Sequence, residues 1–142
     1  MRVVLDTNII LSSISRYSPY RIIIDSFEKN NFELCITNDI LLEYEEKLTE
    51  IFSGEVASLF AGALLLKENV LRTDIYFQWN LIKNDADDNK FVDCAVSSGA
   101  DYLVTNDKDF KEINSIEFPS VAVIDIDEFV SVLQNFLNKK IN

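Results

Sequence analysis

The stretch Arg2–Asn8, with the sequence RVVLDTN, runs three apolar residues directly into an acid. This pattern predicts a short strand over residues 2–6, buried on both faces as in a parallel sheet. Asp6 would then lie at the carboxyl end of the strand, where open α/β sheets bind their ligands. It either caps the next helix, since Asp, Thr and Asn are all good N-caps, or is the first residue of a site.

Short apolar segments alternate with helical patterns along the rest of the chain. We expect further strands over residues 34–36, 70–72, 102–104 and 121–124. We expect helices over residues 8–15, 19–29, 39–52, 55–67, 89–98, 107–113 and 126–139, with residues 75–83 either helical or irregular. This alternation predicts an α/β fold with a parallel sheet and right-handed crossovers.

The helix expected over residues 55–67 is rich in Ala and Leu and apolar nearly all round. Such a helix is usually buried on every side. We therefore expect it to lie in the core or, as the alternative, in the interface of a homodimer.

Composition limits the class of protein. The chain has 142 residues, of which 48% are hydrophobic and 26% charged, so we expect one globular domain over residues 1–142. No apolar run approaches the roughly 18 residues that a membrane span needs, and the N-terminus lacks a signal pattern. We therefore expect a cytoplasmic protein without a membrane partner.

The residue types present also limit the chemistry. The chain contains no histidine, and its two cysteines, Cys35 and Cys94, form no CxxC pair. This excludes the usual zinc sites and any histidine-based catalytic triad. The sequence has no GxGxxG or GxxxxGK[ST] motif, which argues against dinucleotide and P-loop sites. Any catalysis must therefore depend on carboxylates.

The formal net charge is −11, from 13 basic and 24 acidic residues. Phosphate contacts need Lys and Arg, so this charge argues against a module that binds DNA non-specifically. It argues less against a nuclease, because a metal ion can neutralise the acids of a nuclease site.

Three aspartates stand where this topology brings chain segments together. Asp6 ends the first strand, Asp107 follows the strand over residues 102–104, and Asp88 opens the helix that leads into that strand. At about 100° per residue, Asp88 falls on the apolar stripe of its helix. It is therefore either an inward-facing acid, which is costly to bury without a partner or a metal, or an N-cap.

Other acids are less informative. Asp93 lies off the apolar stripe and either supports the site or is solvated, and Asp85 and Asp87 are expected to be solvated. In the helix over residues 39–52, two glutamates flank the apolar stripe on opposite sides, and periodicity does not choose between them. These are Glu43 and Glu45, whereas Glu46 and Glu50 are expected to be solvated.

Clustered carboxylates repel one another and raise each other's pKa values. Proteins keep such clusters mainly to bind hard divalent cations such as Mg²⁺ or Mn²⁺, which prefer oxygen ligands. One or two of these ions can activate water and stabilise the charge that develops during phosphodiester cleavage. This chemistry needs no histidine.

Four segments together resemble the PIN domain family: VVLDTNIIL, LLEYEEKL, DDNKFVDCA and ADYLVTNDKDF. The nearest branch is that of the toxin components of toxin–antitoxin systems, similar to VapC-type toxins. The resemblance spans almost the whole chain. It implies a three-layer fold with a five-stranded parallel sheet of order 3-2-1-4-5.

The resemblance also implies a metal-dependent endoribonuclease that cleaves single-stranded RNA with Mg²⁺ or Mn²⁺. By position, the residues that match the catalytic and metal-binding acids of the family are Asp6, Glu43, Asp88 and Asp107. Supporting positions match Asn8, Asp93 and Thr105. The resemblance further implies a cognate antitoxin protein as partner. The low pI, about 4.3, departs from what an RNA-binding enzyme usually has.

Two other functions remain open at this stage. A phosphotransfer or receiver domain also places an Asp after its first strand. However, haloacid-dehalogenase-like phosphatases have a second Asp two residues later, where this chain has Asn8. The second alternative is a PIN-like interaction domain that has no catalytic activity but keeps its acidic pocket.

Overall fold

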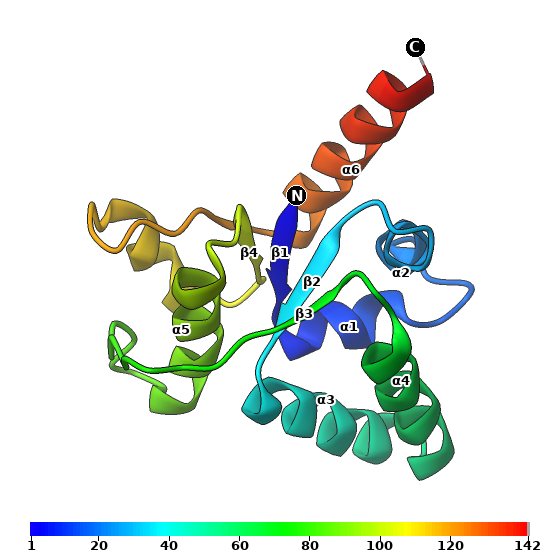
Figure 1. Ribbon diagram of the computed structural model, residues 1–142, viewed down its shortest axis with the longest axis horizontal. Helices are drawn as coiled ribbons and strands as arrows, with labels where there is room; N and C mark the ends of the chain where they lie inside the picture. Colours follow the sequence, from blue (N-terminus) through cyan, green and yellow to red (C-terminus); the bar gives the residue numbers. More distant parts are fainter. Residues whose placement is uncertain (142) are drawn as a thin grey trace.

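A computed structural model describes residues 1–141 and contains one five-stranded sheet (Figure 1). All its strands are parallel, in the order β3-β2-β1-β4-β5. The strands are β1 Arg2–Leu5, β2 Glu33–Ile36, β3 Val70–Arg72, β4 Tyr102–Val104 and β5 Val123–Ile124. The expected fold class and strand order are therefore confirmed.

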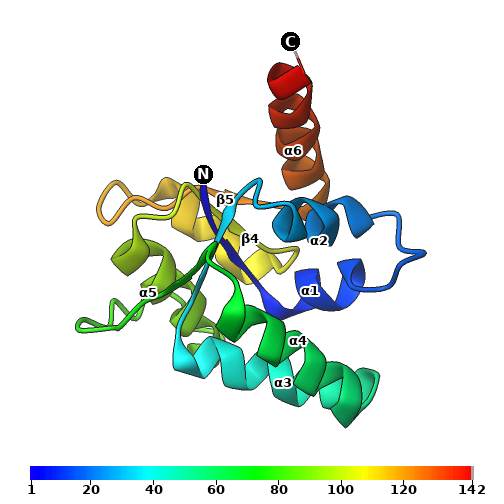
Figure 2. The same cartoon turned by 45° about the vertical axis from the view of Figure 1, so that its right-hand side comes forward.

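Helices cover both faces of the sheet. They are α1 Thr7–Ser13, α2 Arg21–Glu28, α3 Asn38–Ile51, α4 Gly54–Leu66, α5 Asn89–Ser98 and α6 Ile126–Ile141. Figure 1 shows α5 on one side of the sheet and α1 and α2 on the other, with α3 beyond the carboxyl ends of the strands. Helix α6 starts beside the sheet and projects away from it, as Figures 1 and 2 both show. The carboxyl edge of the sheet thus faces a space between α3 and α5.

Large aromatic side chains fill the core. Phe91, Phe110 and Phe129 are fully buried, and Phe129 packs edge-on against Phe32 with ring centroids 5.4 Å apart. Tyr44 is also fully buried, and its hydroxyl donates a hydrogen bond to the carbonyl of Leu5. This bond ties α3 to the end of β1, so the helix is fixed relative to the carboxyl edge of the sheet.

The least regular predictions differ most from the structure. Residues 73–84 form no helix or strand; their backbone is instead bonded to side chains of α5, with the Trp79 N–H donating to Asp93 and Ile82 bonded to Asn89. The helix expected over residues 107–113 is the 3₁₀ helix η2, Lys108–Ser115. The last strand is shorter than expected, because only Val123 and Ile124 pair with β4.

Helix α4 is not buried on every side within the chain, so its expected place in the core is wrong, and the homodimer alternative stays a prediction. It packs chiefly against α3; its buried residues are Ala57, Ala61 and Leu64, and Phe60 packs edge-on against Tyr44. Leu59 and Leu66, in contrast, are 69% and 86% exposed. Within residues 1–141, no helix has both the length and the apolar content needed to cross a membrane.

We expect Leu64→Ala to lower the free energy of unfolding by about 2–5 kcal/mol, since it opens a cavity under a fully buried side chain. Leu66→Ala removes the same atoms from an exposed position and should change the free energy of unfolding by less than about 0.5 kcal/mol. Urea unfolding followed by circular dichroism measures both. Equal effects of the two substitutions would contradict the described orientation of α4.

Candidate metal centre

Asp6 lies directly after β1 and is 6% exposed. Its backbone N–H donates to the carbonyl of Val104 (3.0 Å), and its Oδ2 accepts a hydrogen bond from the Thr105 hydroxyl (2.6 Å). Although Asp6 occupies the N-cap position of α1, its side chain makes no capping hydrogen bond. The Asp6 side chain is therefore not a helix cap; it is an acid held at the carboxyl edge of the sheet.

The environment of Asp6 disfavours its ionised form. Burial raises the pKa of this carboxyl most, the Thr105 hydroxyl lowers it, and the negative charges of Glu43 and Asp107 raise it further. The net direction is upward. Hydrogen bonds connect these acids: Thr105 contacts Asp6 and the Asp107 N–H, and Thr7, which follows Asp6, donates to Glu43.

Asp88 ends the short 3₁₀ helix η1, Ala86–Asp88, and precedes α5. Its side chain caps no helix, and its Oδ2 is buried without a hydrogen-bond partner among the described residues. Burial raises its pKa to about 7, with further upward effects from Asp85, Asp6, Asp107 and Glu43. Asp88 therefore faces inward, as its place on the apolar stripe predicted.

Asp107 and Asp109 complete a group with Asp88. One carboxylate oxygen from each of the three lies within 4.8 Å of the others. The Thr105 hydroxyl oxygen accepts the Asp107 N–H (3.0 Å), and Asp107 Oδ1 accepts the Asp109 N–H (2.9 Å). Thr105 therefore links Asp6 to this turn.

Sequence analysis missed Asp109. The signal was its position two residues after Asp107, in the run Asn106-Asp107-Lys108-Asp109. That spacing brings two carboxylates together only if the chain turns tightly after Asp107, as the start of η2 does. In the straight helix expected there, side chains two positions apart point in different directions.

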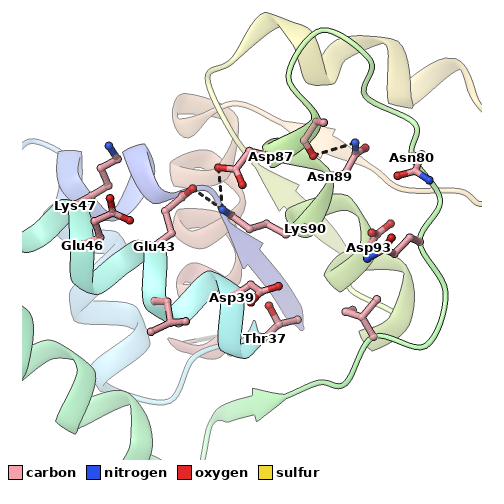
Figure 3. Close-up of a pocket in the computed structure, with 14 residues that line it drawn as sticks. Thr37, Asp39, Glu43, Glu46, Lys47, Asn80, Asp87, Asn89, Lys90 and Asp93 are labelled. Atoms are coloured by element: carbon pink, nitrogen blue, oxygen red, sulfur yellow. Dashed lines mark hydrogen bonds and ion pairs between the residues drawn. The ribbon is translucent and has the colours of Figure 1, made fainter.

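Glu43 projects from α3 into a pocket of about 640 Å³ between α3 and α5 (Figure 3). Its Oε2 accepts a hydrogen bond from the Thr7 hydroxyl, and its Oε1 lies 2.7 Å from Lys90 Nζ. Glu45, on the opposite side of the apolar stripe, does not line the pocket. The choice that periodicity left open therefore falls on Glu43.

Two supporting positions behave differently from Thr105. Asn8 is exposed in the first turn of α1, and its side chain makes no hydrogen bond with the described residues. Asp93 is 5% exposed and accepts the Trp79 N–H at 3.0 Å, so it is not solvated. Burial raises the pKa of Asp93, and the Trp79 N–H lowers it. Asp93 holds the segment 73–84 against α5.

The donor set suits a hard divalent cation. Asp6, Asp88, Asp107 and Asp109 supply oxygen ligands only, as Mg²⁺ and Mn²⁺ prefer. A buried carboxylate oxygen without a partner is costly, and Asp88 Oδ2 is such an atom. A cation bound among these oxygens would satisfy it and offset the mutual repulsion of the acids.

Comparisons with known proteins identify the family and the fold. A sequence profile described as the PIN domain matches residues 2–109. A search of curated proteins finds no match.

Solved structures share the fold at low sequence identity. The chain is similar to one in VapBC2 from Rickettsia felis bound to a promoter DNA fragment, with 18% identity, a TM-score of 0.61 and coverage of 88% of this chain and 98% of that one. A chain of VapBC-1 from nontypeable Haemophilus influenzae is 22% identical with a TM-score of 0.60, and the match covers 89% of this chain and 99% of that one. A chain of FitAcB from Neisseria gonorrhoeae is 15% identical with a TM-score of 0.55, and the match covers 87% of this chain and 97% of that one.

We expect Asp88→Asn to stabilise the metal-free protein at pH 8 and to have little effect near pH 4. The pKa of Asp88 is about 7 in the folded protein, above the ordinary value of 3.8. Ionisation of Asp88 therefore lowers the free energy of unfolding as the pH rises from about 4 to about 7. The gain at pH 8 should be on the order of 1 kcal/mol, because Asp88 is partly exposed and solvent screens its charge. Urea unfolding in EDTA at both pH values measures it. A gain of the same size at pH 4 would refute the linkage.

We expect Asp93→Ala to free the segment 73–84 from α5. Trp79 is the only tryptophan of the chain and packs edge-on against Phe77 and Phe118, so its emission should shift to longer wavelength as the ring becomes exposed. Asp93→Asn keeps an acceptor oxygen and should shift the emission less. An unchanged spectrum in Asp93→Ala would show that this hydrogen bond does not hold the segment.

Proposed function

Because the chain belongs to the PIN domain family, we propose that it is a Mg²⁺- or Mn²⁺-dependent endoribonuclease that cleaves single-stranded RNA. One observation supports this above all: the buried, unpartnered Oδ2 of Asp88 belongs to a carboxylate grouped within 4.8 Å with Asp107 and Asp109. Metal-assisted cleavage of a phosphodiester uses such a group of oxygen ligands and requires no histidine.

Each residue has a definite task in this proposal. Asp88, Asp107 and Asp109 hold the ion, and Asp6 faces it from the end of β1. Thr105 fixes the orientation of Asp6 by donating to its Oδ2. When bound, the ion activates a water molecule and stabilises the negative charge that develops at phosphorus. The raised pKa of Asp88 belongs to the metal-free protein, and a bound ion would favour its ionised form.

Glu43 has a different place from the one that the family resemblance implies. Both of its oxygens are engaged by protein groups, one by Thr7 and the other by Lys90. We infer that Glu43 acts on the metal site through its charge and through these contacts. The resemblance assigned it as a direct ligand.

The acidic charge of the chain can be reconciled with an RNA substrate. A bound divalent ion would neutralise part of the acidic site, and Lys47 and Lys90 line the neighbouring pocket between α3 and α5. Binding to the phosphate backbone would then depend on the metal rather than on a broad basic surface.

We further propose that the chain is the toxin of a toxin–antitoxin pair in the cytoplasm. The similar structures are described as VapBC and FitAcB assemblies. An apolar groove of about 400 Å³ between α2 and α4, lined by Ile24, Phe60 and Leu64 among others, provides surface for a protein partner. A homodimer that covers the exposed leucines of α4 is the alternative use of this surface.

A PIN-like interaction domain without catalytic activity is the rival function. The two differ in whether the acidic group binds metal. Titration calorimetry with Mn²⁺ separates them, since an inactive relic should show no binding at millimolar metal.

We expect the protein to cleave single-stranded RNA in Mn²⁺, leaving a 5′-phosphate and a 3′-hydroxyl, and to lose this activity in EDTA. Asp88→Asn and Asp107→Asn should each lower the rate by about 100-fold or more, since losing a metal ligand costs at least as much as losing a residue that orients one. Gel analysis of a labelled oligonucleotide measures both the rate and the ends.

Asp74→Asn is the matched control, because Asp74 is exposed and lies in the irregular segment outside the acidic group. It should cleave at the wild-type rate. Cleavage by Asp88→Asn at that same rate would identify a contaminating nuclease or another site.

A further inference from the structure

Lys90 lies inside the acidic pocket, and its side chain is only 17% exposed. Its Nζ is 2.7 Å from Glu43 Oε1 and 3.1 Å from Asp87 Oδ2, as the dashed lines in Figure 3 show. The ammonium also lies 5.7 Å from the centre of the Phe91 ring. Lys90 therefore joins α5 to α3 across the site.

The position of Lys90 along its helix is unfavourable for a cation. It is the second residue of α5, and the amino end of a helix carries a partial positive charge. A lysine there is stabilised only if nearby acids compensate. Glu43 does so most strongly, because its side chain is 17% exposed whereas that of Asp87 is 76% exposed and screened by water.

The contacts divide the acids of the site into two groups. Glu43 is neutralised within the protein, since Thr7 and Lys90 engage its two oxygens. The other group, around Asp88, has a buried oxygen without a partner among the described residues. Only the second group offers free ligands to an ion from solution.

We propose that Lys90 is a resident cation that takes the place of a second divalent ion, so that the neighbouring carboxylates around Asp88 bind a single Mg²⁺ or Mn²⁺. The inference rests on the proposed metal-dependent function and specifies its metal count. Lys90 is a positioning residue here: it holds Glu43 and balances its charge, and it leaves one set of carboxylates for the ion.

Removing the charge of Lys90 tests this directly. Wild-type protein should bind one Mn²⁺ in titration calorimetry, with the free ion counted by its electron paramagnetic resonance signal. Lys90→Met keeps the length of the side chain and removes its charge, so it should bind two ions, or one ion with affinity raised on the order of tenfold. Lys90→Arg keeps a cation and should return to the wild-type stoichiometry and affinity.

Lys47→Met is the matched control. Lys47 lines the same pocket, but its side chain is 45% exposed and pairs with Glu50 at 3.3 Å. It should bind Mn²⁺ as the wild type does. Circular dichroism confirms that each variant is folded, and if Lys90→Met is not, Lys90→Gln replaces it.

Two results would overturn the inference: two ions bound by the wild type, or one ion bound by Lys90→Met with unchanged affinity. RNA cleavage, assayed in parallel, separates this from the proposed function. Metal-dependent cleavage with an unchanged count in Lys90→Met refutes only the role of Lys90. If Lys90→Met binds the expected second Mn²⁺ ion but the protein cleaves no RNA, only the ribonuclease proposal is refuted.

Discussion

The burial of neighbouring carboxylates at one edge of the sheet is the constraint on which the site depends. Burial raises the pKa values of Asp6 and Asp88 most, and the charges of Glu43 and Asp107 raise both further. Such an arrangement costs free energy and persists only if other groups offset it. The protein offsets part of it through the hydroxyl groups of Thr7 and Thr105 and the ammonium of Lys90, and the proposed cation would offset the remainder around Asp88.

The fold supplies the rigidity that this arrangement needs. Parallel strands bring their carboxyl ends to one edge, so residues that follow β1 and β4 meet although about a hundred positions separate them. The bond from the Thr105 hydroxyl to Asp6 fixes this meeting, and the Tyr44 hydroxyl fixes α3 to the end of β1. Both bonds are buried, where competition from water is small. The acids are thus held in place before any ion binds.

Tertiary contacts override local pattern at two places, where the sequence-based prediction was wrong (α4) or left two alternatives open (Asp93). The pattern of α4 is apolar on all sides, but only α3 packs closely against it, so Leu59 and Leu66 stay exposed. Asp93 lies off the apolar stripe, yet it is buried because the irregular segment around Trp79 folds over it. Neither packing partner can be identified from periodicity within a helix.

The sequence by itself determined the sheet, since short apolar strands alternating with helices permit few topologies, and it identified Asp6, Asp88 and Asp107 as acids at positions that this topology brings together. Only the tertiary structure added Asp109, because a tight 3₁₀ turn and not a helix follows β4. It also showed that Glu43 is engaged by Thr7 and Lys90, with Lys90 placed between Glu43 and Asp87. The reason is physical: periodicity tells which residues face inward, whereas the contacts made there depend on how separate elements pack.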